Sequence, residues 1–188
     1  MQNVWMTADT HFGHSNIIKY CNRPFATHEE MDETIITRFN EVIKKGDILY
    51  HLGDLAWSTY PLRSGFLDRL NTREVHLVLG NHDDPKRLRN EPFRTQKDIN
   101  RITMDGGRVA IVMCHYAMRT WRNQGHGAYQ LYGHSHGKLV DSGMRQMDVG
   151  VDTNNFYPYH IDEVISRLKD RPYFLKDDPS PIDVGAQA

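Results

Sequence analysis

In Val4-Trp5-Met6-Thr7-Ala8-Asp9-Thr10-His11, an apolar run of strand length ends directly in polar side chains. Two later stretches repeat this arrangement. Residues 48–52 run into Gly53-Asp54, and residues 75–79 run into Gly80-Asn81-His82-Asp83. Short apolar runs bounded by glycine and polar residues predict buried strands. We therefore expect three strands that each deliver Asp, Asn or His at the carboxyl end.

Helical patterns separate these three strands. In residues 27–45, apolar side chains recur on one face at a period of 3.6 residues, and Thr27 and Glu30 match a capping box. A shorter helix is expected at residues 61–70. The first half of the chain is therefore predicted to run β-α-β-α-β.

The second half has a different pattern. Asp105-Gly106-Gly107 lies between apolar runs at residues 99–104 and 108–114, which predicts a hairpin. Further short strands are expected at residues 129–132 and 146–149, followed by a last amphipathic helix at residues 161–168. A hairpin-rich second half joined to the first half predicts an α/β sandwich with a partly parallel sheet.

Composition limits the class of protein. The chain has 188 residues, 23 basic and 24 acidic side chains, and a formal net charge of −1. This length predicts one domain, which we place at residues 1–176, with a flexible tail at residues 177–188. Near-neutral charge predicts no stable complex with nucleic acid, and no apolar run approaches the ~20 residues of a membrane span. Two cysteines and no recognisable secretion signal favour a cytoplasmic location.

Side chains that bind metals follow five of the expected strands. The carboxyl ends of strands line the ligand crevice in open α/β sheets, so five loops can bring these groups together. Imidazole, carboxylate and amide oxygen suit divalent Mn, Fe, Co, Ni or Zn. Seven ligands exceed what one tetrahedral ion needs, but they suffice for two ions if one carboxylate bridges them. The candidate ligands are Asp9, His11, Asp54, Asn81, His115, His134 and His136.

These blocks resemble, in order and spacing, the five motifs of the calcineurin-like metallophosphoesterase superfamily. The resemblance extends to about residue 162 and is closest to small, single-domain bacterial and phage members. It implies an α/β fold, specifically a four-layer α-β-β-α sandwich with two mixed sheets. The matching motifs are Asp9-x-His11, Gly53-Asp54, Gly80-Asn81-His82-Asp83, His115 and Gly133-His134-x-His136.

The resemblance also implies how the site is arranged. Asp54 would bridge the two ions, His82 would face the scissile phosphate, and Asp83 would orient His82. Asn81 and His82 would contact the substrate, and His14, three residues after His11, is a further candidate for that role. The first ion would be held by Asp9, His11, Asp54 and His136, and the second by Asp54, Asn81, His115 and His134.

The expected activity is hydrolysis of phosphate mono- or diesters by a dinuclear metal-dependent phosphatase or phosphodiesterase. Two cations about 3.5–4 Å apart neutralise the phosphoryl oxygens and activate a bridging hydroxide. His82 would then protonate the leaving group as a general acid. Manganese is the expected metal, with Fe, Zn, Ni or Co as alternatives. Because no large insertion supplies a cap, we expect a small, nucleotide-like phosphoester as substrate.

Other functions stay open at this point. The same fold could serve as a non-catalytic protein-interaction module, although the intact ligand set and His82 argue against it, or as a phosphoprotein phosphatase. A metallo-β-lactamase is disfavoured, because Gly137-Lys138 after His136 breaks its His-x-His-x-Asp-His pattern. Arg23, Arg119 and Arg122 are candidate phosphate ligands, but a solvated surface role is the simpler interpretation of each.

Overall fold

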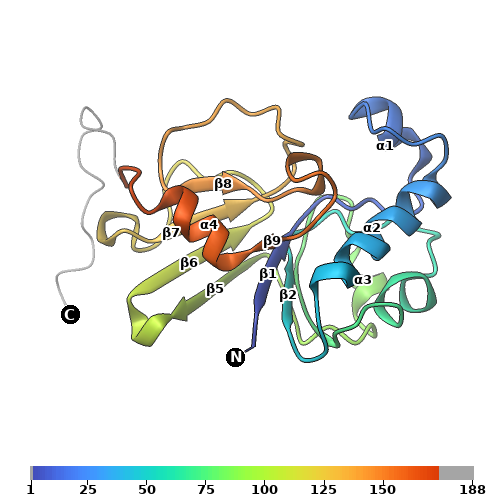
Figure 1. Cartoon of the computed structure of the whole chain (residues 1–188), viewed down its shortest axis with the longest axis horizontal. Coiled ribbons are helices and arrows are strands. Elements are labelled where there is room, and N and C mark those ends of the chain that lie inside the picture. Colours follow the sequence, from blue (N-terminus) through green and yellow to red (C-terminus); the bar gives the residue numbers. More distant parts are fainter. Residues whose placement is uncertain (1, 174–188) are drawn as a thin grey trace.

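Five strands form the first sheet of the computed structural model, which describes residues 2–173 (Figure 1). Their order is β4-β3-β2-β1-β9, and all but β9 run parallel. The bounds are β1 (Val4–Thr7), β2 (Ile48–His51), β3 (Glu74–Val78), β4 (Thr95–Lys97) and β9 (Tyr159–His160). Because β1, β2 and β3 are parallel, their carboxyl ends lie at the same edge of the sheet. The predicted tail at residues 177–188 lies outside the described residues.

The second sheet has the order β5-β6-β7-β8. Its strands are β5 (Ile99–Met104), β6 (Val109–Cys114), β7 (Tyr129–Tyr132) and β8 (Gln146–Asp148). β5 and β6 form the predicted hairpin, closed by the short 3₁₀ turn η2 (Asp105–Gly107). The expectation of further hairpins is wrong, since β7 and β8 run parallel to β6. The connections at residues 115–128 and 133–145 are long enough for the crossovers that parallel pairing requires.

Helix α2 (His28–Val42) covers the outer face of the first sheet (Figure 1). Thr27 accepts a hydrogen bond from the Glu30 amide at 3.3 Å, and the Glu30 carboxylate accepts one from Ala26 at 2.8 Å. The predicted capping box is therefore present in part, because the Glu30 carboxylate accepts the amide of Ala26 and not that of the N-cap residue Thr27. The helix ends before residue 45, because Ile43 is already extended. The other helices and helical turns are α1 (Ser15–Tyr20), η1 (Arg63–Leu67), α3 (Pro85–Leu88), η3 (Gln124–His126), η4 (Val151–Thr153) and α4 (Ile161–Leu168).

Two large apolar cores hold the layers together. One joins α2, through Met31, Ile35 and Phe39, to the first sheet. The other lies between the two sheets and includes residues of α4, such as Val164. On the outer face of the second sheet, the loop at residues 116–128 packs Trp121 over the strands. Two mixed sheets with flanking helices confirm the predicted α/β sandwich.

The strand ends of the two sheets meet at one place. The Asp9 amide donates to the carbonyl of Gly53 at 2.9 Å, within the first sheet. Across the sheets, the Val151 amide, which follows β8, donates to the carbonyl of Ala8, which follows β1, at 3.0 Å. The loops that leave β1, β2 and β8 therefore converge.

Candidate metal centre

Asp9, His11 and His136 form the first group of ligands. One ligand atom from each lies within 4.8 Å of the other two. Asp9 and His11 follow β1, and His136 belongs to the loop after β7. Asp9 is fully buried, and both of its carboxylate oxygens accept the His134 amide at 2.9 Å. This bond ties the loop after β7 to the loop after β1.

Asp54, His115 and His134 form the second group, with ligand atoms again within 4.8 Å of one another. Asp54 connects the two groups. Its Oδ2 lies 3.5 Å from Nε2 of His11 and 3.4 Å from Nε2 of His115. Asn81 joins the second group, because its Oδ1 lies 3.1 Å from the same His115 nitrogen. The structure thus brings all seven predicted ligands together and divides them around Asp54.

The backbone at these positions is strained. Asp9, His11, Asp54, His134 and His136 all have positive φ angles, between 48° and 66°. Left-handed backbone costs a non-glycine residue about 1–3 kcal/mol, and such residues concentrate at functional sites. Five of the seven predicted ligands therefore occupy a conformation that local sequence preferences do not explain.

Two glycines allow the close approach of the strand ends. A Cβ added at Gly80 would collide with the Asp54 carboxylate, and one at Gly133 would lie 2.7 Å from Oδ2 of Asp9. Neither position has room for a side chain. Gly80 and Gly133 therefore form the backbone walls behind the two central carboxylates.

The donor set fits a divalent cation. Nε2 of His11 is buried without a hydrogen-bond partner, although a carboxylate oxygen lies 3.5 Å away. Burial lowers the pKa of His11 to about 2, so the imidazole is neutral and its lone pair is free. Burial also raises the pKa of Asp9 to about 7. Burial alone would raise the pKa of Asp54 too, but the hydrogen bond and charge of His115 hold it below its usual range. A cation would compensate these desolvated carboxylates.

His136 is fixed from behind by a buried ion pair. Its Nδ1 lies 2.7 Å from Oδ2 of Asp152, whose oxygens accept from Arg23 at 2.7 and 2.8 Å. Arg23 also donates to the carbonyls of Asp9, at 2.6 Å, and Thr10, at 3.0 Å. The interpretation of Arg23 as a phosphate ligand or a solvated surface residue is wrong. Its side chain is buried, and its guanidinium group already donates to Asp152 and to two backbone carbonyls. Orientation of metal-binding histidines by such carboxylates is common.

Sequence reasoning missed Asp152, although a signal for it was present. Asp148 is the last residue of β8 and Asp152 lies in the turn η4 that follows it, so this is another strand that ends in acidic residues. Asp148 accepts hydrogen bonds from Ser135 at 2.7 Å and Gly137 at 2.9 Å, which shapes the loop that carries His134 and His136. Cys21, Asp152 and His136 also form a third group within 4.8 Å, which shares His136 with the first.

The loop after β3 places His82 at the rim of the centre. The His82 amide donates to Oδ1 of Asp54 at 2.9 Å, and its exposed ring lies 5.4 Å from that of His11. Asp83 has a different role from the one expected. Its carboxylate accepts the backbone amides of Asp54, Leu55 and Gly80 at 2.8–3.1 Å, so it fixes the loop rather than the His82 ring.

Aromatic side chains surround His14 beside the first group. The Trp57 ring stacks on His14 with centroids 4.4 Å apart, and Tyr20 approaches the same imidazole edge-on at 6.5 Å. His14 in turn lies 5.5 Å from His11 and 6.2 Å from His82. Trp57 is 43% exposed. His14 is therefore near the centre, and an exposed indole lies next to it.

Comparison with known proteins agrees with this geometry. The model of the calcineurin-like phosphoesterase superfamily domain matches residues 3–150, so the chain belongs to that superfamily. An uncharacterized protein of Methanocaldococcus jannaschii is 31% identical, covering 90% of this chain and 93% of its own length. The Gene 66 protein of Mycobacterium phage D29 is 28% identical, covering 90% and 98%.

A solved structure shows the same fold. The protein AQ665 of unknown function from Aquifex aeolicus superposes with a TM-score of 0.71 at 25% identity, over 89% of this chain and all of its own. Membership of the superfamily indicates a phosphoester hydrolase that uses metal ions. Within residues 2–173, no helix combines the length and apolar character needed to cross a membrane.

Proposed function

We propose that this protein is a dinuclear metal-dependent phosphoesterase that acts on small, nucleotide-like phosphoesters. The observation that carries the proposal is the position of Asp54. One of its carboxylate oxygens lies 3.5 Å from a histidine nitrogen of the first group and 3.4 Å from one of the second. A carboxylate between two imidazole groups is suited to bridge two cations.

The first ion would be held by Asp9, His11 and His136, the second by Asn81, His115 and His134, and both by Asp54. Bound divalent ions supply charge neutralisation at the phosphoryl oxygens and a water of lowered pKa. Manganese is our proposed metal, since oxygen and imidazole donors suit it. The protein itself contributes alignment, through loops that are fixed by Asp83 and Asp152.

His82 is the proposed general acid. Its backbone is fixed by Asp54, and its ring is exposed at the rim, where a leaving group can reach it. An imidazole can hold a proton and pass it to a leaving oxygen. The His82 ring would give its proton to the leaving oxygen as the P–O bond breaks, and Asn81 and His14 would contact the substrate beside it.

Two surfaces support a substrate with a planar organic group. The exposed indole of Trp57 is fixed by stacking on His14, which makes it available for a base on its other face. A cavity of about 350 Å³ lies beside the second group, lined by Gly80, Asp83, Ile99 and Tyr116 among others. The centroid of the Tyr116 ring lies 4.8 Å from that of His134 and 5.0 Å from that of His115. These two surfaces support a small nucleotide as the proposed substrate.

A cytoplasmic location is part of the proposal. Both cysteines, Cys21 and Cys114, are free thiols, which suits a reducing compartment. The formal net charge of −1 gives no general attraction to nucleic acid, so we propose no stable nucleic-acid partner.

Turnover of defined esters tests the proposal. The protein would be loaded separately with Mn, Zn, Ni, Co or Fe and assayed with p-nitrophenyl phosphate, bis-p-nitrophenyl phosphate, a cyclic nucleotide and a phosphopeptide. We expect metal-dependent hydrolysis of the small esters, and the mono- and diaryl esters separate phosphatase from phosphodiesterase activity. Hydrolysis of the phosphopeptide alone would identify a phosphoprotein phosphatase. Bound metal without turnover of any ester would favour the non-catalytic module.

A further inference from the structure

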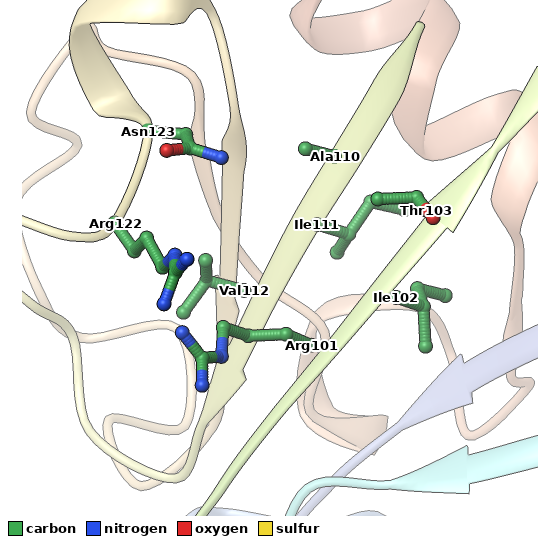
Figure 2. Close-up of a pocket in the computed structure, with 8 residues that line it drawn as sticks. All are labelled: Arg101, Ile102, Thr103, Ala110, Ile111, Val112, Arg122 and Asn123. Carbon is green, nitrogen blue, oxygen red and sulfur yellow. The ribbon is translucent and has the colours of Figure 1, made fainter. Parts of the chain in front are cut away.

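A second hollow lies away from the candidate metal centre, on the outer face of the second sheet. Its volume is about 330 Å³, and none of the predicted metal ligands lines it. Figure 2 shows that the Arg101 side chain from β5 and the Arg122 side chain from the loop after β6 extend into the same space, beside Val112. Thr103 and Asn123 lie at its margin.

Strand register explains why this hollow faces outward. Arg101 pairs with Val112 across the β5–β6 hairpin, so the two side chains share a face of the sheet. Val112 belongs to the small outer cluster with Trp121, whereas its neighbours Ile111 and Met113 belong to the core between the sheets. The hollow therefore has an apolar floor and a positively charged margin.

The loop that carries Arg122 is fixed in place. The preceding residue, Trp121, is buried, and its indole nitrogen donates to the carbonyl of Ala128 at 2.9 Å. Asn123 has a positive φ of 60°, and its carbonyl accepts the amides of His126 and Ala128 at 3.0 Å. Arg122 is thus presented by a preorganised turn, which lowers the conformational cost of binding a ligand.

The charges of Arg101 and Arg122 are not compensated. Among residues 2–173, neither guanidinium has a hydrogen-bond or ion-pair partner. Other surface arginines differ, since Arg69, Arg94 and Arg167 each donate to a carboxylate at 2.5–2.6 Å. Two guanidiniums that share one hollow without an acid match the needs of a phosphoryl group, which accepts several charge-assisted hydrogen bonds.

We propose that this hollow binds a small organic phosphate, with the phosphoryl group between Arg101 and Arg122 and the organic part over Val112. The site is separate from the metal centre, because Val112 lies three residues before His115 along the chain, a spacing of about 10 Å in an extended strand.

Side-chain NMR of the full chain, prepared without added metal, tests the proposal with phenylphosphonate, which has no ester bond to hydrolyse. We expect saturable shifts of the Arg101 and Arg122 Nε–H signals with one common Kd. Inorganic phosphate should bind several-fold more weakly, because it leaves the apolar floor uncovered. Equal binding of benzoate would contradict a phosphoryl site and indicate a general anion site.

Substitutions separate this site from general charge effects. Arg101→Gln and Arg122→Gln remove one exposed charge each and should weaken phenylphosphonate binding about tenfold. Arg119→Gln is the matched control, because Arg119 is an exposed arginine without a described partner that does not line the hollow. Linear shifts of similar size at Arg119, or unchanged affinity in Arg122→Gln, would overturn the proposal.

Discussion

The two halves of the candidate metal centre are fixed by different parts of the chain. In the first half, His136 is oriented by Asp152, which is paired with Arg23 from a region 129 positions away. In the second half, Nδ1 of His115 lies 2.8 Å from the backbone carbonyl of Leu52, and Asp83 fixes the loop of Asp54 through backbone amides. The first half depends on a long-range side-chain pair, whereas the second depends mostly on backbone.

The two halves should therefore differ in their sensitivity to substitution and in the rate at which they exchange metal ions. Removing one partner of a buried ion pair leaves a charge uncompensated, so the first half is sensitive to a single isosteric substitution. The second half is more open, because His134 and Asn81 are exposed while Asp9 and His11 are buried. We expect the second ion to exchange faster than the first.

Asp54→Asn should have the largest effect, because it breaks both halves together. An amide cannot balance two cations, so we expect loss of at least one ion and activity near background. Asp68→Asn, at an exposed aspartate outside the centre, is the control. Metal analysis and turnover of an aryl phosphate check the prediction. Near-normal turnover would show that Asp54 is not a bridging ligand.

His82→Ala should lower kcat by about 10²–10⁴-fold for an ester with a poor alkoxide leaving group. Nitrophenolate needs little protonation, so the loss should be small for nitrophenyl esters. Both ions should be retained, since His82 is not counted as a ligand. The control is His126→Ala, an exposed histidine in η3. Equal losses for both esters would indicate that His82 stabilises the phosphoryl oxygens instead.

Asp152→Asn separates the halves. The substitution weakens the hydrogen bond that orients His136, so the affinity for the first ion should fall by about 10–100-fold. The other ion should bind as before. Calorimetric titration of the metal-free protein resolves the two binding steps. A similar weakening of both steps would contradict the independent support of the two halves.

Trp57→Ala tests the substrate surface beside the first half. Base stacking is worth about 1–3 kcal/mol, and a half-exposed platform lies near the lower limit, so KM for a nucleotide should rise about fivefold. We expect kcat to stay within twofold, and Trp57→Phe should restore most of the affinity. An alkyl ester without a ring is the control substrate. If its KM rises equally, the indole has only a structural role.

The smallest effect is expected at Asp32 of α2, whose side chain is hydrogen-bonded to the loop that carries His11. Its carboxylate accepts the Gly13 amide at 3.0 Å, and burial raises its pKa to about 6. The folded state then holds a proton on Asp32 that the unfolded state releases above about pH 4, so the contribution of Asp32 to the free energy of unfolding should fall as pH rises from about 4 to about 6. Urea titrations of the unaltered protein and of Asp32→Asn should therefore differ in slope over this range. An unchanged slope would remove Asp32 as its source.

The candidate ligands could be predicted because each lies in the loop that follows a strand of high apolar content. All seven gather at one edge, which is the position that their sequence context indicated. The pairing of Arg23 with Asp152 could not be predicted, since nothing local distinguishes a buried arginine from a solvated one. Only the meeting of distant loops buries it.

The parts of the fold that the sequence did not predict are short elements and the direction of two strands. β4 has 3 residues and β9 has 2, which is too few for a periodic pattern. Helix α1 follows His14 without any side-chain cap, so no start signal is present. The parallel direction of β7 and β8 depends on the paths of their connecting loops, and the strands themselves look the same in either direction.

The number of metal ions bound by one chain distinguishes a dinuclear centre from a mononuclear one. The protein would be reconstituted with excess manganese, freed of loosely bound metal and measured by elemental analysis against protein concentration. The dinuclear assignment predicts two ions per chain, falling to one or none in Asp54→Asn. One ion per chain at saturation in the unaltered protein would contradict it.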